Sequence, residues 1–501
     1  MAVALLALAS PTLAQDSAGP ANPFDLALSE AEIQEPLPSA APAITNQELL
    51  ERLEKTEAEL AELRQGLQTP IPGDGSTTIL ESLQQRWSQV RDPSITTVDQ
   101  QTYSAGGRGG PKPWFERLSI RGYAQFRYNT TVYEAEDSAP PQAVGDRSVG
   151  DNQHFLIRRA RVILSGDVSE HMYVYLQTDF ASSVPNSPDA YYFAQIRDWY
   201  ADLYIDEEKV YRVRVGQSKI PYGWENLQSS SNRIPLDRSD SLNSAVRNER
   251  DLGVFYYWTP EAQQDLFKEV LDKGLKGSGN YGVFALGVYN GQGGSLMEQN
   301  DNLYVVSRFA YPFKLQSGQI VELGIQGYTG MYTVLSSSIL PLGVGPAMRP
   351  WGTLETGNRG GFRDQRIAGT FVWYPQPWGF QAEWNVGEGP ALNEAQTAIT
   401  DRSLRGGYAM MMYKVETERA GVLFPFLRWN YYHGGYKAER NAPYAKINEW
   451  EAGVEWQFNP QMELTLDYTI TNRTNTTAYP DRESYRQFDG HLIRSQFQIN
   501  Y

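Results

Sequence analysis

The segment Ile493-Arg494-Ser495-Gln496-Phe497-Gln498-Ile499-Asn500-Tyr501 decides the fold. Side chains of a strand point alternately to its two faces, so Ile493, Phe497 and Ile499 share one face with the terminal Tyr501. The polar residues between them share the other face. About 9–11 residues of strand are enough to cross a bilayer, so this segment fits a membrane strand with one face in lipid and one in water.

Sixteen segments of this kind run from about residue 117 to residue 501, joined by connections that are alternately short and long. An even strand number, short periplasmic turns and long outer loops are typical of bacterial outer-membrane barrels. The sequence therefore predicts an all-β transmembrane barrel of 16 antiparallel strands. We place the strands near 117–128, 153–166, 170–181, 196–206, 209–218, 250–258, 280–290, 302–312, 318–329, 361–375, 378–388, 403–415, 421–433, 445–458, 461–472 and 489–501. The long connection 259–279 carries a predicted helix over Gln263–Leu271.

Composition excludes several other classes of protein. The mean hydropathy is −0.50, too polar for a bundle of membrane helices, whereas a barrel needs apolar residues at only every second strand position. The chain has no cysteine, so disulfide scaffolds and thiolate metal sites are excluded, and its net charge of −15 argues against nucleic-acid binding. The four histidines are scattered and show no metal-binding spacing. We expect neither a metal nor a cofactor.

The sequence before the barrel divides into four predicted parts. Residues 1–14 resemble the apolar core and cleavage site of a secretory signal, with a buried helix as the alternative. Residues 15–44 are a Pro-, Ala- and Ser-rich spacer. Leucines at alternating steps of four and three over 45–68 predict a periplasmic coiled-coil helix, with a lone surface helix as the alternative. Residues 69–116 form a linker with a possible short helix, and 117–501 form the barrel.

Arginines fall on the polar faces of several predicted strands, which places them in the lumen. A charge facing lipid near the bilayer midplane costs about 2–4 kcal/mol. The predicted lumenal residues are Arg121, Arg127, Arg159, Arg161, Arg212 and Arg214. Two readings stay open for Arg159 and Arg161, which lie about 7 Å apart on one face: they line an anion path, or lumenal acids such as Asp179, Asp198 and Asp202 neutralise them. Strict alternation would turn Arg158 outward, so we expect it at an interface or beside a bulge.

The connection from Lys219 to Glu249 is long enough to fold into the lumen and narrow it. Its charges are of both signs and are able to set a field across a constriction, whereas the alternative is an ordinary surface loop. The predicted constriction residues are Lys219, Arg233, Asp237, Arg238, Asp240 and Arg247.

Four stretches together resemble the phosphate-selective porin family (porins O and P). They are Ile157-Arg158-Arg159-Ala160-Arg161, Gly216-Gln217-Ser218-Lys219-Ile220-Pro221-Tyr222-Gly223-Trp224-Glu225, Arg250-Asp251-Leu252-Gly253 and Tyr289-Asn290-Gly291-Gln292-Gly293. The resemblance covers roughly 117–501. It implies a trimeric 16-stranded porin, an inward-folded third loop and an arginine-lined anion path, with Arg159 and Arg161 on that path and Lys219 at the start of the constriction loop. The loop here has few lysines and several acids, whereas the resemblance implies a lysine-rich loop in the phosphate-selective members.

We therefore expect an outer-membrane porin through which small solutes and ions diffuse passively, with a preference for anions or phosphate set by lumenal arginines. Two alternatives remain: a structural barrel tethered to peptidoglycan by its coiled coil, and a barrel enzyme, for which no nucleophile with an oriented base is visible. The expected partners are outer-membrane lipid, two further copies of the chain in a homotrimer, the permeating ions and peptidoglycan.

Overall fold

The computed structural model describes residues 114–146, 148–150, 155–181, 194–294, 296–335, 360–394, 396–474 and 487–501. The predicted signal segment 1–14, the spacer 15–44, the coiled-coil helix 45–68 and most of the linker 69–116 lie outside these residues. They stay predictions.

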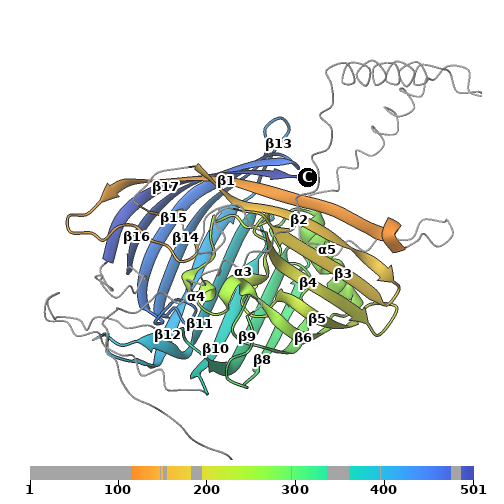
Figure 1. The fold of residues 1–501 in the computed structure, drawn as a ribbon. Helices are drawn as coiled ribbons and strands as arrows, with labels where there is room; N and C mark the ends of the chain where they lie inside the picture. Colours follow the sequence, from red (N-terminus) through yellow and green to blue (C-terminus); the bar gives the residue numbers. More distant parts are fainter. Residues whose placement is uncertain are drawn as a thin grey trace, which may run out of the picture. The chain divides into compact units, whose positions relative to one another are not determined.

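The strands form one antiparallel sheet that closes on itself, because β1 pairs with both β2 and β17. Figure 1 shows the resulting barrel. The strands are β1 (Leu118–Glu134), β2 (Phe155–Ser169), β3 (Met172–Asp179), β4 (Gln195–Tyr204), β5 (Tyr211–Lys219), β6 (Arg250–Trp258), β7 (Phe284–Tyr289), β8 (Tyr304–Lys314), β9 (Ile320–Tyr332), β10 (Phe362–Trp373), β11 (Trp378–Leu392), β12 (Ile399–Tyr413), β13 (Val415–Thr417), β14 (Gly421–Gly435), β15 (Tyr444–Asn459), β16 (Met462–Thr474) and β17 (Gln487–Asn500).

The three-residue strand β13 continues β12 after the single residue Lys414. Both pair with β14, with Met412 opposite Phe426 and Val415 opposite Leu423. Together they form one wall strand, so the barrel has the 16 strands predicted. Each predicted segment overlaps one observed strand; β7 is shorter than its prediction, and β12 begins four residues earlier.

In the described part of the chain, five short helices accompany the strands. They are η1 (Trp114–Arg117), α3 (Trp224–Leu227), α4 (Asp240–Asn243), η2 (Arg247–Glu249) and α5 (Glu261–Asp272). Helix α5 confirms the helix predicted within the connection 259–279. Among the described residues, no helix combines the length and the apolarity that a membrane crossing requires.

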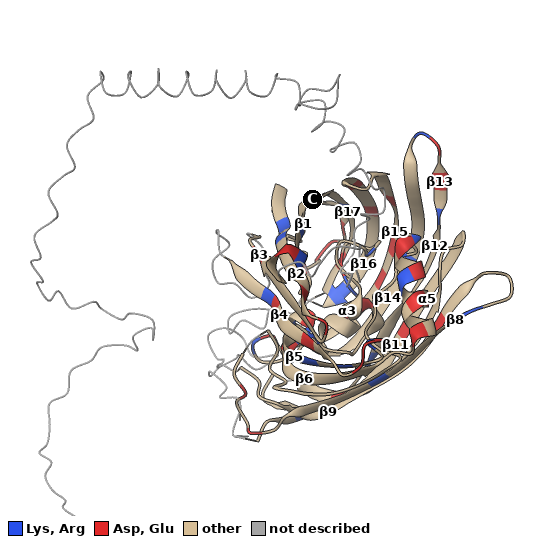
Figure 2. Cartoon of the chain, turned by 90° about the vertical axis from the view of Figure 1, so that its right-hand side faces the viewer, with Lys and Arg blue, Asp and Glu red and all other residues tan. Residues whose placement is uncertain are grey.

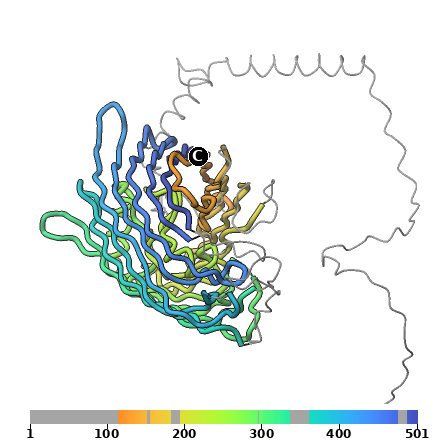
Figure 3. Tube along the Cα trace, turned by 90° about the vertical axis from the view of Figure 1, so that its left-hand side faces the viewer, coloured from red at the N-terminus to blue at the C-terminus, as the bar shows by residue number. Residues whose placement is uncertain are grey.

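Short and long connections alternate along the chain, except that 259–283, which contains α5, lies on the side of the short turns (Figure 3). On one side, β2 turns into β3 through two residues, 170–171, and β15 into β16 through 460–461. On the other side, the connections include 135–154, 220–249 and 333–361. Short turns mark the periplasmic side and long loops the outer side of such barrels.

Alternation of the two faces follows the pleat of the strands. On β16, Leu466 and Tyr468 are 46% and 40% exposed on the outside, whereas Asp467 and Thr469 between them are 3% and 1% exposed. The outer wall therefore presents apolar side chains to lipid, and the polar face turns into the lumen, as predicted.

Candidate functional site

The connection 220–249 leaves β5 and folds into the barrel, where α3 and α4 lie inside the ring of strands (Figure 1). Nearly all of its residues are buried, and Trp224 has no exposed surface. Gly223 makes the turn at a φ of 83°, and a Cβ there would lie 3.0 Å from side-chain atoms of Asn226 and Leu242. Because side chains with a Cβ rarely adopt this φ, glycine at 223 lets the chain turn into the lumen.

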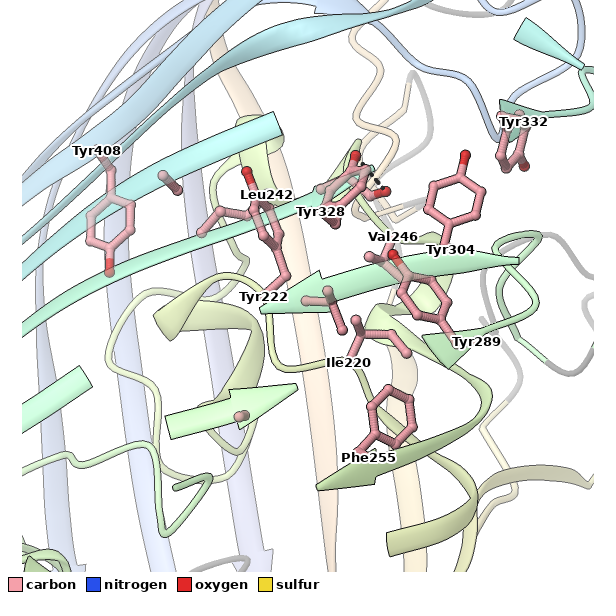
Figure 4. Close-up of a cluster of buried hydrophobic side chains, with 14 of the residues drawn as sticks. Ile220, Tyr222, Leu242, Val246, Phe255, Tyr289, Tyr304, Tyr328, Tyr332 and Tyr408 are labelled. Carbon is pink, nitrogen blue, oxygen red and sulfur yellow. Dashed lines mark hydrogen bonds between the residues drawn. The ribbon is translucent and has the colours of Figure 1, made fainter. Parts of the chain in front are cut away.

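Apolar side chains hold one side of the loop against the wall formed by β6–β9 (Figure 4). The rings of Tyr222 and Tyr328 meet edge to face at 4.7 Å, and the Tyr328 hydroxyl donates to the carbonyl oxygen of Ala245 at 3.2 Å. The cluster includes loop residues Ile220, Leu242 and Val246 and wall residues Phe255, Tyr289, Tyr304 and Tyr332. This part of the lumen is a packed core.

Ion pairs fasten the opposite side of the loop to the wall. Glu225 accepts hydrogen bonds from Arg428 of β14 at 2.9 and 3.1 Å. Asp237 lies between Arg127 of β1, 3.0 Å away, and Arg494 of β17. Burial alone would raise the pKa of Asp237, but the surrounding arginines hold that pKa well below its usual range. The carboxylate of Asp237 is therefore ionised and forms ion pairs with both arginines.

Asp240, at the start of α4, is the third fastening acid. It pairs with Arg473 of β16 and accepts a hydrogen bond from the Tyr436 hydroxyl. Burial raises its pKa, and Arg473 opposes that rise. Arg366 of β10 binds the same helix by donating to the carbonyl oxygen of Ser241 at 3.0 Å. Three loop acids therefore face wall arginines, and the loop arginines Arg238 and Arg247 lie on the side of β2 and β4.

Two β-bulges each turn one further arginine into the lumen. Arg159 of β2 lies opposite Gln125 of β1, and the register then slips to Ile157, so Arg158 is the extra residue. The same slip between β3 and β4 makes Arg197 the extra residue. Both arginines are 5% exposed. A bulge re-aims a side chain that strict alternation would place on the outer face.

These arginines meet in a cavity of about 50 Å³ between the loop and the strands β2–β4. A water molecule needs only about 10–15 Å³ on this measure, so the space is large enough for a few water molecules or for one small ion without its full hydration shell. Charges of both signs lie along the strands around α3 (Figure 2). Among the described residues, the charged lining consists of Arg158, Arg159, Arg161, Arg197, Arg238, Arg247, Asp179, Glu249 and Glu439.

The arginines of the cavity differ in how they are paired. Arg161 forms an ion pair with Asp179 at 2.8 Å. Arg159 donates one hydrogen bond, to Gln125 Oε1 at 2.7 Å, and no ion pair joins it to any carboxylate of the described residues. Arg158 lies 3.6 Å from Asp146 and 3.7 Å from Asp237, and Arg197 lies 3.5 Å from Glu249. Within the described lining, six arginines face three carboxylates, so positive charge is in excess.

Glu249 is the main anion of this cavity. Its Oε1 lies 2.5 Å from Arg238 and 2.6 Å from Arg250, and its Oε2 lies 3.5 Å from Arg197. Burial alone would raise its pKa, but the three arginines hold the pKa of Glu249 well below its usual range. One carboxylate thus links the loop to β4 and β6.

The other predicted lumenal arginines lie on the inner face, and each has a hydrogen-bond or ion-pair partner. Arg214 binds Asp202 through two bonds of 2.7 and 2.9 Å, and Arg212 lies 3.5 Å from the same carboxylate. Neutralisation by lumenal acids, the second interpretation given for Arg159 and Arg161, therefore holds for Arg161. Arg212 and Arg214 are neutralised in the same way. Arg121 is partly exposed and donates to Ser165 Oγ at 2.8 Å.

Two predicted constriction residues stabilise the loop internally. Lys219 donates to the carbonyl oxygens of Leu227 and Gln228 at 3.0 and 3.3 Å. Arg233 donates to the carbonyl oxygen of Leu236 at 3.3 Å, and burial lowers its pKa to about 10. Lys219, the last residue of β5, and Arg233 of the loop therefore stabilise the loop in addition to its ion pairs with the wall.

Sequence reasoning missed three residues that build the site: Arg197, Glu249 and Asp146. Asp146, from the connection between β1 and β2, lies 2.6 Å from Arg127 and 2.7 Å from Arg494. No local pattern signals that contact. Arg197 had a signal, because adjacent Arg and Asp residues in a membrane strand cannot both face the lumen unless the strand bulges.

Among the described residues, no group of His, Asp or Glu side chains is arranged to hold a metal ion. The molecule is a closed barrel with an apolar outer wall and a polar lumen narrowed by an inward loop. This arrangement defines an outer-membrane pore.

The phosphate-selective porin O and P family model matches residues 141–501, and the chain belongs to this family. It is an outer-membrane channel for small solutes. Similar solved structures include Salmonella typhi OmpF in complex with daunomycin (13% identity, 77% of this chain and 97% of that chain, TM-score 0.46). Others are the channel DcaP of Acinetobacter baumannii (10%, 77% and 97%, 0.44) and the anion-selective porin from Comamonas acidovorans (10%, 77% and 99%, 0.43). No curated protein matches the sequence.

Proposed function

We propose that this porin selects anions and that small oxyanions, phosphate among them, bind in the cavity between the loop and β2–β4. The supporting observation is the charge of that cavity, where six arginines face three carboxylates. Arg159 carries the argument, because it is buried and, among the described residues, its side chain donates one hydrogen bond, to the neutral amide of Gln125.

A guanidinium stays protonated in proteins, so a buried arginine without a carboxylate lacks a counter-charge. An entering anion supplies that charge and relieves the repulsion between neighbouring arginines. The planar fork of arginine donors also matches the oxygen spacing of phosphate and carboxylate. Arg159 on the wall and Arg238 on the loop would contact such an ion from two sides, which favours oxyanions over cations.

The test is the reversal potential of the full-length protein in a planar bilayer with a KCl gradient. We expect a potential of the sign given by chloride permeation, and a decrease in chloride current when phosphate is added. A potential of the sign given by potassium would contradict the proposal.

We further propose that the channel is a homotrimer whose subunits meet at β3–β7. These strands contain 6–10 residues, whereas β8–β12 contain 11–15. A lipid-facing strand needs about 9–11 residues, so β3 and β7, with 8 and 6 residues, are too short to cross the bilayer, and β4–β6, with 9–10, barely reach that length. We call β3–β7 the low wall. Its outer face carries Trp199, Leu203 and Val215, which are 61%, 41% and 44% exposed. Burial against another subunit would remove this apolar surface from contact with lipid.

Size measurement in detergent tests the interface. The variant Leu203→Asn/Val215→Asn should shift the trimer toward monomers. The control Met411→Asn/Leu427→Asn places the same change on the longer strands β12 and β14, where the two side chains are 48% and 43% exposed. Equal oligomeric states of the two variants would contradict the proposal.

The predicted periplasmic helix 45–68 would fasten the trimer or contact peptidoglycan. Deletion of residues 15–100 separates these roles. A less heat-stable trimer would support fastening, whereas an unchanged trimer that no longer sediments with peptidoglycan would support wall contact.

A further inference from the structure

A groove of about 800 Å³ crosses the outer wall from β8 to β14, outside the lumen. Its floor is formed by small residues, Gly369, Ala382 and Ala409, which belong to three neighbouring strands. Larger apolar side chains border it, including Leu323 at 47% and Trp384 at 40% exposure. Because this wall is high enough to face the bilayer, the groove opens toward lipid chains.

A row of basic side chains lies on the same outer face, nearer the long loops. Arg405 of β12 is the register partner of His433 on β14, which is the partner of Lys446 on β15. Arg405 and Lys446 are exposed, and neither forms an ion pair with another described residue. Strands lie about 4.8 Å apart, so the two cations stand roughly 10 Å from each other across His433.

Aromatic side chains connect the basic row with the groove. Arg405 precedes Ala409 by four residues on β12, and His433 follows Trp429 by four on β14, which is about 13 Å along a strand. Between these levels, the rings of Trp384 and Tyr431 stack at 5.8 Å. The outer wall thus presents cations, then aromatic rings, then an apolar groove, which is the order of headgroup, interface and acyl chain in a lipid.

We propose that this surface binds lipid A, the phosphorylated glycolipid of the outer leaflet. The basic row would hold a phosphate, and the groove would hold an acyl chain. Charge complementarity supports this occupant, because basic clusters at a membrane surface bind anionic headgroups. The side of the membrane supports it as well, since the row lies toward the long loops, which mark the outer face.

The test uses the full-length oligomer in detergent, mixed with purified lipid A and analysed by native mass spectrometry. Each Lys or Arg near an anionic lipid surface contributes roughly fivefold to binding, so Arg405→Ala/Lys446→Ala should bind lipid A roughly 30-fold more weakly than the unmodified protein. The control Lys268→Ala/Arg419→Ala removes two cations from the short-turn side and should leave lipid A binding unchanged. Equal single-channel conductance would confirm that all variants are folded.

A second variant tests the groove. A Cβ at Gly369 would meet no atom within 4 Å, so Gly369→Leu adds volume to the floor without strain. It should weaken binding of lipid A and leave binding of its deacylated sugar phosphate unchanged.

Three results would overturn the proposal. The first is equal lipid A binding by the unmodified protein and Arg405→Ala/Lys446→Ala. The second is equal binding of phosphatidylglycerol and lipid A. The third is dissociation of the oligomer by Gly369→Leu with lipid A binding intact, which would assign the groove to a second copy of the chain.

Discussion

Arg159→Ala removes the arginine of the cavity that has a neutral partner. For an anion in contact with Arg159, about 4 Å from the lost charge, Coulomb's law gives about 1 kcal/mol in bulk water and about 4 kcal/mol at an effective dielectric constant of about 20. Anion occupancy should therefore fall at least about 5-fold, and up to about 900-fold in the low-dielectric limit. Arg159→Ala also relieves repulsion with Arg158 and Arg161, so the barrel should keep its stability.

The assay is the reversal potential in a KCl gradient at low ionic strength, where screening is weakest. Arg159→Ala should shift the potential toward zero, and Arg159→Lys, which retains the charge, should shift it less. Arg161→Ala breaks the ion pair with Asp179 and should also destabilise the barrel by about 3–5 kcal/mol. Arg159→Ala/Arg161→Ala should show the largest loss of anion preference. An unchanged potential in folded Arg159→Ala would refute the assignment of Arg159 to the permeation path.

Three further changes probe the loop and its surroundings. Glu225→Ala removes both carboxylate oxygens to which Arg428 Nη2 donates, so urea unfolding should show a loss of about 3 kcal/mol in the free energy of unfolding and single-channel recordings a larger conductance; unchanged values would contradict the fastening role. Gly223→Ala places a Cβ at a φ of 83° and should lower the free energy of unfolding by about 1–3 kcal/mol in the same assay. An unchanged free energy would show that the turn tolerates a Cβ. Lys437, in the connection between β14 and β15, is buried beside Asp364 of β10. Burial lowers the pKa of Lys437 to about 8, so a rise from pH 7 to 9 removes positive charge and should reduce anion preference in the unmodified protein and not in Lys437→Arg. Equal pH profiles would exclude Lys437 as the titrating group.

The strand order and the two faces were predictable because each depends on residues close in sequence. Alternation within a segment identifies its lipid face, as on β16, where Leu466 and Tyr468 lie outside and Asp467 inside. Unequal connections then identify the side of the membrane. The family motifs also predicted the inward loop. The composition of that segment alone was compatible with either a constriction or a surface loop.

The pairing of charges inside the lumen was not predictable, because it depends on residues far apart in sequence. Asp146 and Arg494 are 348 positions apart and lie 2.7 Å from each other. Both extra arginines reach the lumen only through register slips; a bulge at Arg158 was one of the two alternatives expected from the sequence, whereas the bulge at Arg197 was missed. A sequence pattern with a strict period of two cannot indicate such slips, and only the adjacent charges suggested them.

The acidic composition of the loop is compatible with an anion channel because of where its acids lie. Glu225 is bound to Arg428 of β14, and Asp237 lies between Arg127 of β1 and Arg494 of β17, 3.7 Å from the cavity arginine Arg158. Their charges thus fasten the loop and neutralise arginines of the wall. Among the described residues, the cavity still retains Arg159 without a carboxylate partner. Net charge therefore says little about selectivity here, since the sign of the field along the pore depends on which face of the loop each charge occupies.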